Sequence, residues 1–240
     1  MPGFVLHILH GQWILSRSKD AYDPQAVRQF MTGLLIPDSC SGDSKERSHF
    51  IPPEAADSIL HIPDVNAFAA AYGLYLREPF VRGYAAHLWL DKVFFEDFFQ
   101  RFIQFQDGQG QSTLREKDVR RVYLSRLNRY ITVDELFSEQ YLYGYYTALN
   151  RRLIDKYRLT IPEKSDAPIP VKEVRLQDFD RITDDLKRYF SAVPPAVSPD
   201  LFGQDALDDF LSRAADSFLA YERRMSNEQC GLCHGFSLHE

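Results

Sequence analysis

The chain has 240 residues, enough for one large domain or two small ones, and its 45% hydrophobic content argues against a disordered protein. The 28 basic and 34 acidic residues leave a net charge of −6 with no strongly basic block, so general nucleic-acid binding is not expected. No run approaches the roughly 20 apolar residues of a membrane span, the first residues lack the features of a secretory signal, and 3 cysteines make no disulfide framework, so we expect a cytoplasmic protein.

Periodic apolar residues divide the first half of the chain into helices around one long loop. They predict helices over residues 3–17, 24–35 and 65–74, and a long helix over 79–106. The last is apolar on most of its circumference, so we expect it at the centre of the fold. Residues 37–64 are rich in Pro, Ser, Asp and Gly and predict a loop, and structureless loops of this length are often functional.

The second half also has the pattern of helices. A basic amphipathic pattern predicts a helix over 115–130, and a capping box begins a helix that runs from 132 to about 156. A proline-containing linker over 161–170 precedes two C-terminal helices over 176–191 and 200–226. No strand hairpin and no internal repeat is evident, so the prediction is an all-α fold.

These elements predict three parts of unequal length. Residues 1–160 form the helical region that carries the candidate site, residues 171–226 are helices packed on it, and residues 227–240 are a tail.

The strongest chemical signal is the pair His87 and Asp91, which project from one helix face a turn apart. An imidazole and a carboxylate at this spacing can hold one metal ion. The alternative is a core histidine bonded to a helical neighbour. Asp91 lies in a very apolar segment, where an unpaired carboxylate is costly to bury, and Gly83 leaves room for a ligand one turn before His87. Both observations favour a metal or a strong hydrogen-bond partner.

Three upstream residues could complete such a site. Taken alone, Asp38 is a turn residue after a proline, His49 is a loop histidine, and His7 is a core histidine on an apolar helix face. Together they predict a site of nitrogen and oxygen ligands for zinc or another divalent ion. His10 lies on roughly the same helix face as His7. It could hydrogen-bond to a metal ligand from outside the coordination sphere, or it could be a partly exposed helix residue.

The ordered set resembles the bacterial zinc-dependent phospholipase C family, and the opening Met-Pro-Gly-Phe resembles its intracellular, signal-less branch. The resemblance covers roughly residues 1–105 and implies an all-helical fold with a metal cluster that holds hydroxide against a phosphodiester phosphorus. The matching pieces are His7, Pro37-Asp38, Ser48-His49-Phe50, and Gly83-Tyr84 through His87 and Asp91.

The resemblance also implies a role for each matching residue. Asp38, His49, His87 and Asp91 would hold a first ion, and His7 and Asp91 would share a second, with Asp91 bridging. Asp38 could act as general base as well, because a metal-bound carboxylate lies beside the water that it deprotonates.

Downstream, the chain departs from the family pattern. Six residues after Asp91 the family has a histidine, where this chain has Asp97, and no histidine follows until His234, so the expected His-x-x-x-Glu pair is missing. Asp97, Glu96 and Asp155 are the candidates to replace it. One or two ions are therefore expected rather than three.

The sequence thus predicts a metal-dependent phosphoesterase, a phospholipase C-like hydrolase of a phosphodiester or phospholipid-like small substrate. The alternative is a non-catalytic helical scaffold or interaction protein that keeps one structural metal. The phenylalanines over 94–105, with Tyr141 and Tyr145, are core residues or an apolar lining for a lipid or nucleoside.

The tail carries a separate motif, Cys230-Gly-Leu-Cys233-His234. This is the pattern of c-type haem attachment, which belongs to exported proteins. A small zinc or redox site is the other interpretation, with His239 as a further ligand. A terminal segment without fixed structure is the third.

Overall fold

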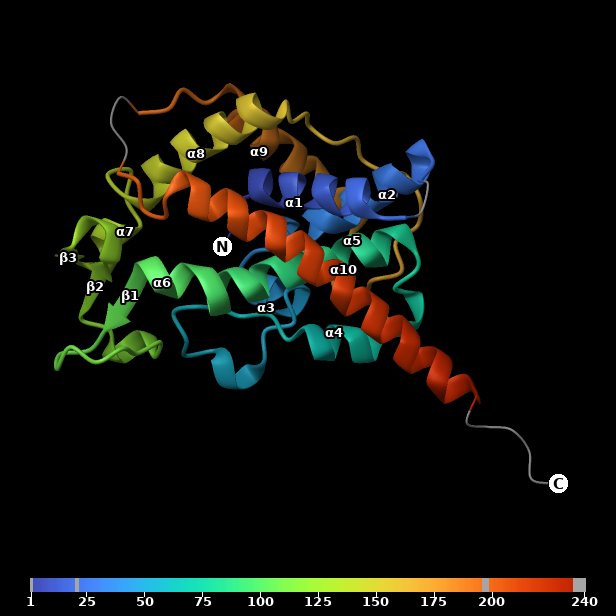
Figure 1. Cartoon of the computed structure of the whole chain (residues 1–240), viewed down its shortest axis with the longest axis horizontal. Coiled ribbons are helices and arrows are strands. Elements are labelled where there is room, and N and C mark those ends of the chain that lie inside the picture. The colour runs from blue at the N-terminus through green and yellow to red at the C-terminus, as the bar shows by residue number, and fades with distance from the viewer. Residues whose placement is uncertain (1, 20–21, 196–198, 235–240) are drawn as a thin grey trace.

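Helix α5 (Pro79–Val93) is the central element of the protein. In the computed structural model, which describes residues 2–19, 22–195 and 199–234 (side chains to residue 225), α5 packs against four other helices (Figure 1). Almost every α5 side chain from Phe80 to Asp91 is buried. The predicted central position is therefore confirmed. The four helices are α1 (Phe4–Arg17), α2 (Pro24–Leu35), α4 (Val65–Tyr72) and α10 (Gln204–His234).

Among the described elements, α2 and α5 make the most extensive contact, and two glycines permit their close approach. A Cβ on Gly33 would overlap the carbonyl oxygen of Phe80, and a Cβ on Gly83 would overlap that of Phe30. Each helix therefore presents a bare backbone to the other. This close approach brings the end of α2 beside the middle of α5.

The segment predicted as a loop contains short helices. These are η1 (Ile36–Ser39), α3 (Asp43–Ser48) and η2 (Pro53–Ala55), and η3 (Gly73–Tyr75) follows α4. The buried Tyr84 hydroxyl donates to the Ser48 carbonyl at 2.5 Å, and the Ser48 hydroxyl donates to the Pro37 carbonyl at 2.9 Å. These bonds tie the segment to α5.

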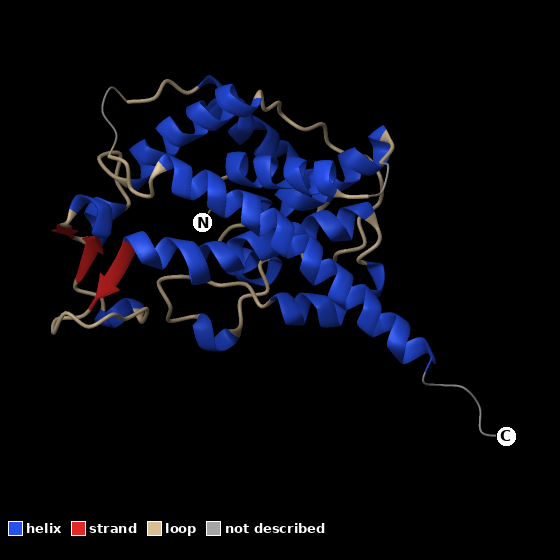
Figure 2. Ribbon diagram, viewed as in Figure 1, coloured by secondary structure: helices blue, strands red, loops and turns tan. Residues whose placement is uncertain are grey.

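After α5 the helix continues as a π-helical stretch, η4 (Phe94–Phe99), and a last turn, α6 (Gln100–Phe102). The predicted helix over 79–106 ends there, because Ile103–Gln106 form strand β1. A small antiparallel sheet, in the order β1-β2-β3, lies at one end of the molecule (Figure 2). The other strands are β2 (Arg121–Leu124) and β3 (Arg129–Ile131), beside the short turns η5 (Glu116–Asp118) and η6 (Ser125–Leu127).

The all-α prediction is therefore wrong for this segment, and the helix over 115–130 does not exist. Val122, Leu124 and Ile131 alternate with exposed or half-exposed neighbours, which is the period of a strand. Asn128 adopts a left-handed conformation (φ 46°) that turns the chain between β2 and β3. The regularly spaced arginines lie outside the sheet's buried face. Their spacing is similar to that of the polar side of a helix, which is why a helix was predicted here. The fold is mostly helical with this one sheet.

The C-terminal half agrees better with the prediction. The capping box is present, with the Glu135 amide donating to the Thr132 hydroxyl and the Thr132 amide donating to the Glu135 carboxylate. It caps only the short α7 (Val133–Leu136), because the chain breaks before α8 (Leu142–Tyr157). The linker over 161–170 has no helix. Beyond it come η7 (Leu176–Asp178) and α9 (Phe179–Ser191), which packs on α8, and α10, which crosses α1 and α5 (Figure 1).

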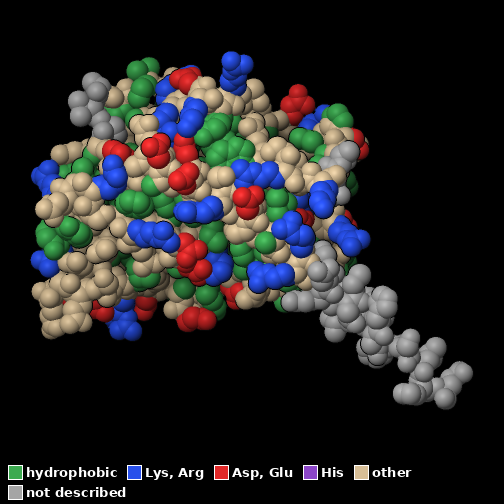
Figure 3. All heavy atoms as spheres, viewed as in Figure 1, with side chains coloured by type: hydrophobic (Ala, Val, Ile, Leu, Met, Phe, Trp, Pro, Cys, Tyr) green, Lys and Arg blue, Asp and Glu red, His purple; other side chains and the backbone are tan. Residues whose placement is uncertain are grey.

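The surface is of mixed charge. Basic and acidic side chains alternate over the face drawn in Figure 3. Among the described helices, none is both long and apolar enough to cross a membrane.

Substituting Gly83 by alanine tests the contact between α2 and α5. The added methyl group must push the helices apart, so we expect Gly83→Ala to lower the free energy of unfolding by about 1–3 kcal/mol in urea denaturation. Gly108→Ala is the control, since its Cβ would meet only the flexible Arg120 side chain at 4.0 Å. Equal stability of the two variants would contradict the close packing.

Candidate metal centre

Five residues proposed from the sequence meet at one place in the interior. His7 comes from α1, Asp38 from η1, His49 from the end of α3, and His87 and Asp91 from α5. The side chains of His7, His87 and Asp91 are fully buried, and those of His49 and Asp38 are only 2% and 8% exposed. The fold thus brings together residues as much as 84 positions apart in a space that water hardly reaches.

The ligand atoms are spaced as they are around a metal ion. His49 Nε2 lies 3.3 Å from Asp38 Oδ1 and 3.2 Å from His87 Nε2, and His7 Nε2 lies 3.2 Å from Asp91 Oδ1. Ligands about 2.0–2.1 Å from a tetrahedral zinc are separated by about 3.3–3.4 Å. The atoms form two overlapping groups that could each hold an ion, and the groups share His87.

Asp91 belongs to the group that it forms with His7 and His87, and it also faces His49 of the other group. Its Oδ1 faces His7, while its Oδ2 lies 3.7 Å from His49 Nε2 and 3.8 Å from His87 Nε2. The two oxygens of one carboxylate therefore point to different sets of histidines, as a bridging carboxylate requires.

Backbone carbonyls orient two of the imidazoles. His87 Nδ1 is 2.8 Å from the carbonyl oxygen of Leu34, and His49 Nδ1 is 2.9 Å from that of Lys45. A carbonyl only accepts, so in each neutral imidazole Nδ1 carries the proton and Nε2 carries the lone pair. The two lone pairs then face each other at 3.2 Å, beside carboxylate oxygens. A cation bound between these acceptors would offset their mutual repulsion, and the Lys45 ammonium, 3.3 Å from Asp38 Oδ1, is the nearby positive group that the described residues supply.

The buried polar atoms without hydrogen-bond partners also favour a bound cation. Asp38 Oδ1, both oxygens of Asp91 and both ring nitrogens of His7 have no hydrogen-bond partner within the described residues. Buried polar atoms are rarely left unpaired, and each costs about 1–3 kcal/mol. The residues present therefore fit a divalent ion.

The electrostatics favour the ligand forms at neutral pH. Burial lowers the pKa of His87 to about 3, and neighbouring His7 adds to the effect, so His87 is neutral. Burial alone would raise the pKa of Asp38, but its contact with His49 and the charge of Lys45 hold that pKa well below its ordinary value. Burial likewise opposes a lowering of the Asp91 pKa, which the close contacts with His87 and His7 nevertheless bring about.

Further buried polar groups surround the centre. His10 is fully buried with both ring nitrogens unpartnered, and burial together with His7 and His87 lowers its pKa to about 3. The interpretation of His10 as partly exposed is therefore wrong. The Tyr146 hydroxyl, from α8, is also buried without a partner in the described part of the chain, and its pKa is raised by burial, by Tyr145 and by the charge of Asp91.

Sequence reasoning missed Tyr146, because a tyrosine in an apolar helix has the pattern of a core residue. It also missed Lys45, whose ammonium lies 3.3 Å from Asp38 Oδ1. The signal was the spacing of four residues between Lys45 and His49, which places both on one face of a helix.

The candidates for the missing downstream ligands do not reach the centre. Glu96 and Asp97 are exposed on η4, and Glu96 pairs with Lys92. Asp155 is exposed on α8 and pairs with Arg151. The third group of ligands implied by the resemblance is therefore not replaced by these three carboxylates.

The tail motif falls outside the described side chains. Helix α10 extends to His234, but the side chains of Cys230, Cys233 and His234 are not described, and His239 lies beyond the described residues.

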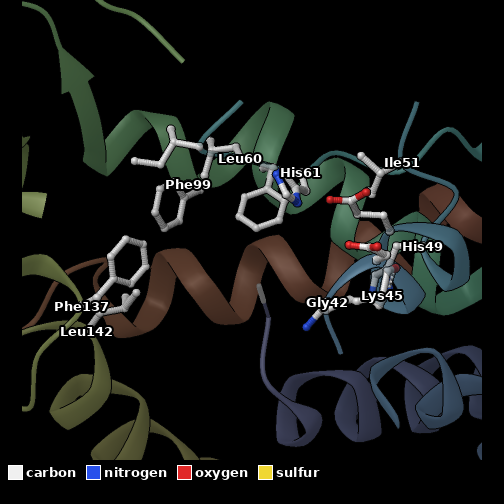
Figure 4. Close-up of a pocket in the computed structure, with 13 residues that line it drawn as sticks. Gly42, Lys45, His49, Ile51, Leu60, His61, Phe99, Phe137 and Leu142 are labelled. Carbon is white, nitrogen blue, oxygen red and sulfur yellow. Dashed lines mark hydrogen bonds between the residues drawn. The ribbon is translucent and has the colours of Figure 1, made fainter. Parts of the chain in front are cut away.

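A cavity of about 390 Å³ opens beside His49. Lys45 and His49 lie at one end of it, and Phe137 and Leu142 lie at the other, with Phe99 between them (Figure 4). Of the phenylalanine cluster, Phe95 and Phe99 thus line a cavity, whereas Phe94 and Phe98 pack in the core. The cavity is polar where it meets the centre and apolar at its far end.

The chain matches no protein-family model, no curated protein and no solved structure at a significant level. The geometry of the buried His/Asp cluster, which could hold a metal ion, is therefore the basis for any statement about function.

The metal-free protein should lose stability as the pH falls below about 6.5. His10 and His87 are neutral in the folded chain down to about pH 3, but they bind protons near pH 6.5 when unfolded. Their contribution is therefore complete above pH 6.5 and is lost as the pH falls toward 3. We expect His10→Leu to reduce the slope of unfolding free energy against pH by up to ~1.4 kcal/mol per pH unit between about pH 6.5 and 5.

Urea denaturation in the presence of a chelator, at a series of pH values, measures that slope. An unchanged slope in His10→Leu would show that His10 is already protonated in the folded protein.

Proposed function

We propose that the protein is a metal-dependent hydrolase that cleaves a phosphodiester, with a fold related to that of the zinc-dependent phospholipases C. The observation that carries the proposal is the convergence of imidazole and carboxylate ligand atoms, with nearest neighbours at 3.2–3.3 Å, beside a cavity that one of these residues, His49, lines. A purely structural metal needs no cavity beside its ligands, whereas a substrate does.

The ligand set favours zinc. Three imidazoles and two carboxylates supply nitrogen and oxygen atoms without sulfur, and such ligands are those of catalytic zinc sites. His49, His87, Asp38 and Asp91 would hold one ion, and His7 with the second oxygen of Asp91 would hold another. A bound divalent ion supplies a Lewis acid for phosphoryl oxygens and lowers the pKa of water.

The chain's own residues supply the rest of the chemistry. His87, neutral at physiological pH, keeps its Nε2 lone pair toward the centre through its bond to Leu34. Asp38 is ionised, and its Oδ1 lies 3.3 Å from both His49 Nε2 and the Lys45 ammonium, two residues that line the cavity, so we assign it the role of accepting a proton from water. Phe99, Phe137 and Leu142 provide an apolar wall that excludes water and suits the hydrocarbon part of a small phospholipid-like substrate (Figure 4).

His87→Ala is the direct test. The variant should lose metal affinity by roughly a hundredfold or more, since even an outer-shell change costs 10–100-fold, and it should lose hydrolysis of phosphodiesters with it. Metal analysis of the purified protein and a screen of phosphodiester substrates measure both quantities.

His61→Ala is the matched control, because His61 lines the same cavity but belongs to neither group of candidate ligands among the described residues. It should keep its metal. A wild-type protein that binds no divalent ion would refute the proposal, and a protein that binds one ion but cleaves no phosphodiester would support a structural metal instead.

A further inference from the structure

Helix α3 presents one face to the cavity. Gly42, Lys45, Glu46 and His49 all line it, and their spacing of three and four residues places them on the same side of the helix. One short segment therefore supplies a candidate ligand, His49, together with the charged groups that surround it. Lys45 is the only lysine or arginine among the residues that line this cavity.

Lys45 contacts the centre twice. Its carbonyl oxygen holds Nδ1 of His49, at 2.9 Å, and its ammonium lies 3.3 Å from Asp38 Oδ1. That same oxygen is 3.3 Å from His49 Nε2, so it is the atom of Asp38 that faces the proposed ion. The ammonium is thus next to the position of the ion and at the edge of the cavity.

The Lys45 side chain is 36% exposed, so it is neither buried in the core nor free in solvent. An ammonium group has three donors, and Asp38 is its only ion-pair partner within the described residues. Donors therefore remain for a group that enters the cavity.

The charges of the candidate centre and of the cavity wall indicate that the group entering the cavity is an anion. With a single divalent ion bound, the carboxylates of Asp38 and Asp91 balance its charge and His87 is neutral, so Lys45 makes the centre net positive; a second ion would add to that positive charge. Asp43 and Glu46 also line the cavity and form no ion pair among the described residues, which makes the remainder of the wall unfavourable for an anion. An anion is therefore directed to the space between the ion and Lys45.

We propose that Lys45 is a substrate-binding residue that holds a non-bridging oxygen of the phosphate group beside the metal centre. The inference rests on the proposed function and adds a specificity-determining residue to it. It identifies the substrate as one whose phosphate remains anionic when bound, because a neutral phosphotriester gains nothing from the ammonium.

Inorganic phosphate is the probe that tests this role without catalysis. Zinc-loaded protein is titrated with phosphate by calorimetry, for the wild type and for Lys45→Met, Lys45→Arg and Lys164→Met. Lys164 is the matched control, because its ammonium also pairs with an aspartate, Asp180, at 2.8 Å. Lys45→Met should weaken phosphate binding about tenfold or more, Lys45→Arg should restore part of it, and Lys164→Met should leave it unchanged.

Metal affinity separates this role from a structural one. The carbonyl that orients His49 is retained in every variant, so Lys45→Met should bind zinc as tightly as the wild type or more tightly, since a repelling charge is removed. A loss of zinc affinity in Lys45→Met would assign Lys45 to the support of the centre and overturn the inference. If Lys45→Met bound phosphate as tightly as the wild type, the inference would also be overturned, but the proposed function would not be affected. A wild type that binds no zinc would refute both proposals before phosphate is added.

Discussion

The candidate metal centre depends on the contact between α2 and α5. Gly33 and Gly83 let the two backbones approach, and the approach brings the carbonyl of Leu34 to 2.8 Å from His87 Nδ1. That bond fixes the protonation and direction of the imidazole. Without it, the lone pair of Nε2 would not face the centre, and the ring could turn away from Asp91. The packing of two helices thus determines the chemistry of a side chain.

Helix α5 also positions His49, which belongs to the segment between α2 and α4. Tyr84, one turn before His87, holds the carbonyl of Ser48, and the next residue is His49. Helix α5 therefore positions ligands of its own and a ligand that belongs to a different segment. Because the helix is buried along nearly its whole length, these positions have little freedom, and the acceptor atoms remain close despite their mutual repulsion. A bound cation would relieve this repulsion.

The sequence predicted the parts of the site that depend on local spacing. The pair His87 and Asp91 was predicted from helical spacing and from the apolar surroundings of Asp91. Asp38, His49 and His7 were added as members of an ordered set that resembles the zinc-dependent phospholipases C. Lys45 and Tyr146 were not predicted as part of the site, because only the packing of α3 and α8 against the centre brings them near the candidate ligands. The sheet was missed for a different reason: strands of three or four residues are too short to outweigh a regular series of arginines, and Asn128 was not recognised as the turn between them.

The most direct test of a nitrogen and oxygen metal centre is the X-ray absorption spectrum of the zinc-loaded protein at the zinc edge. We expect imidazole and carboxylate ligands at about 2.0–2.1 Å and no sulfur. Scattering from sulfur at about 2.3 Å would place the ion on cysteine and contradict the assignment of the centre to His7, Asp38, His49, His87 and Asp91.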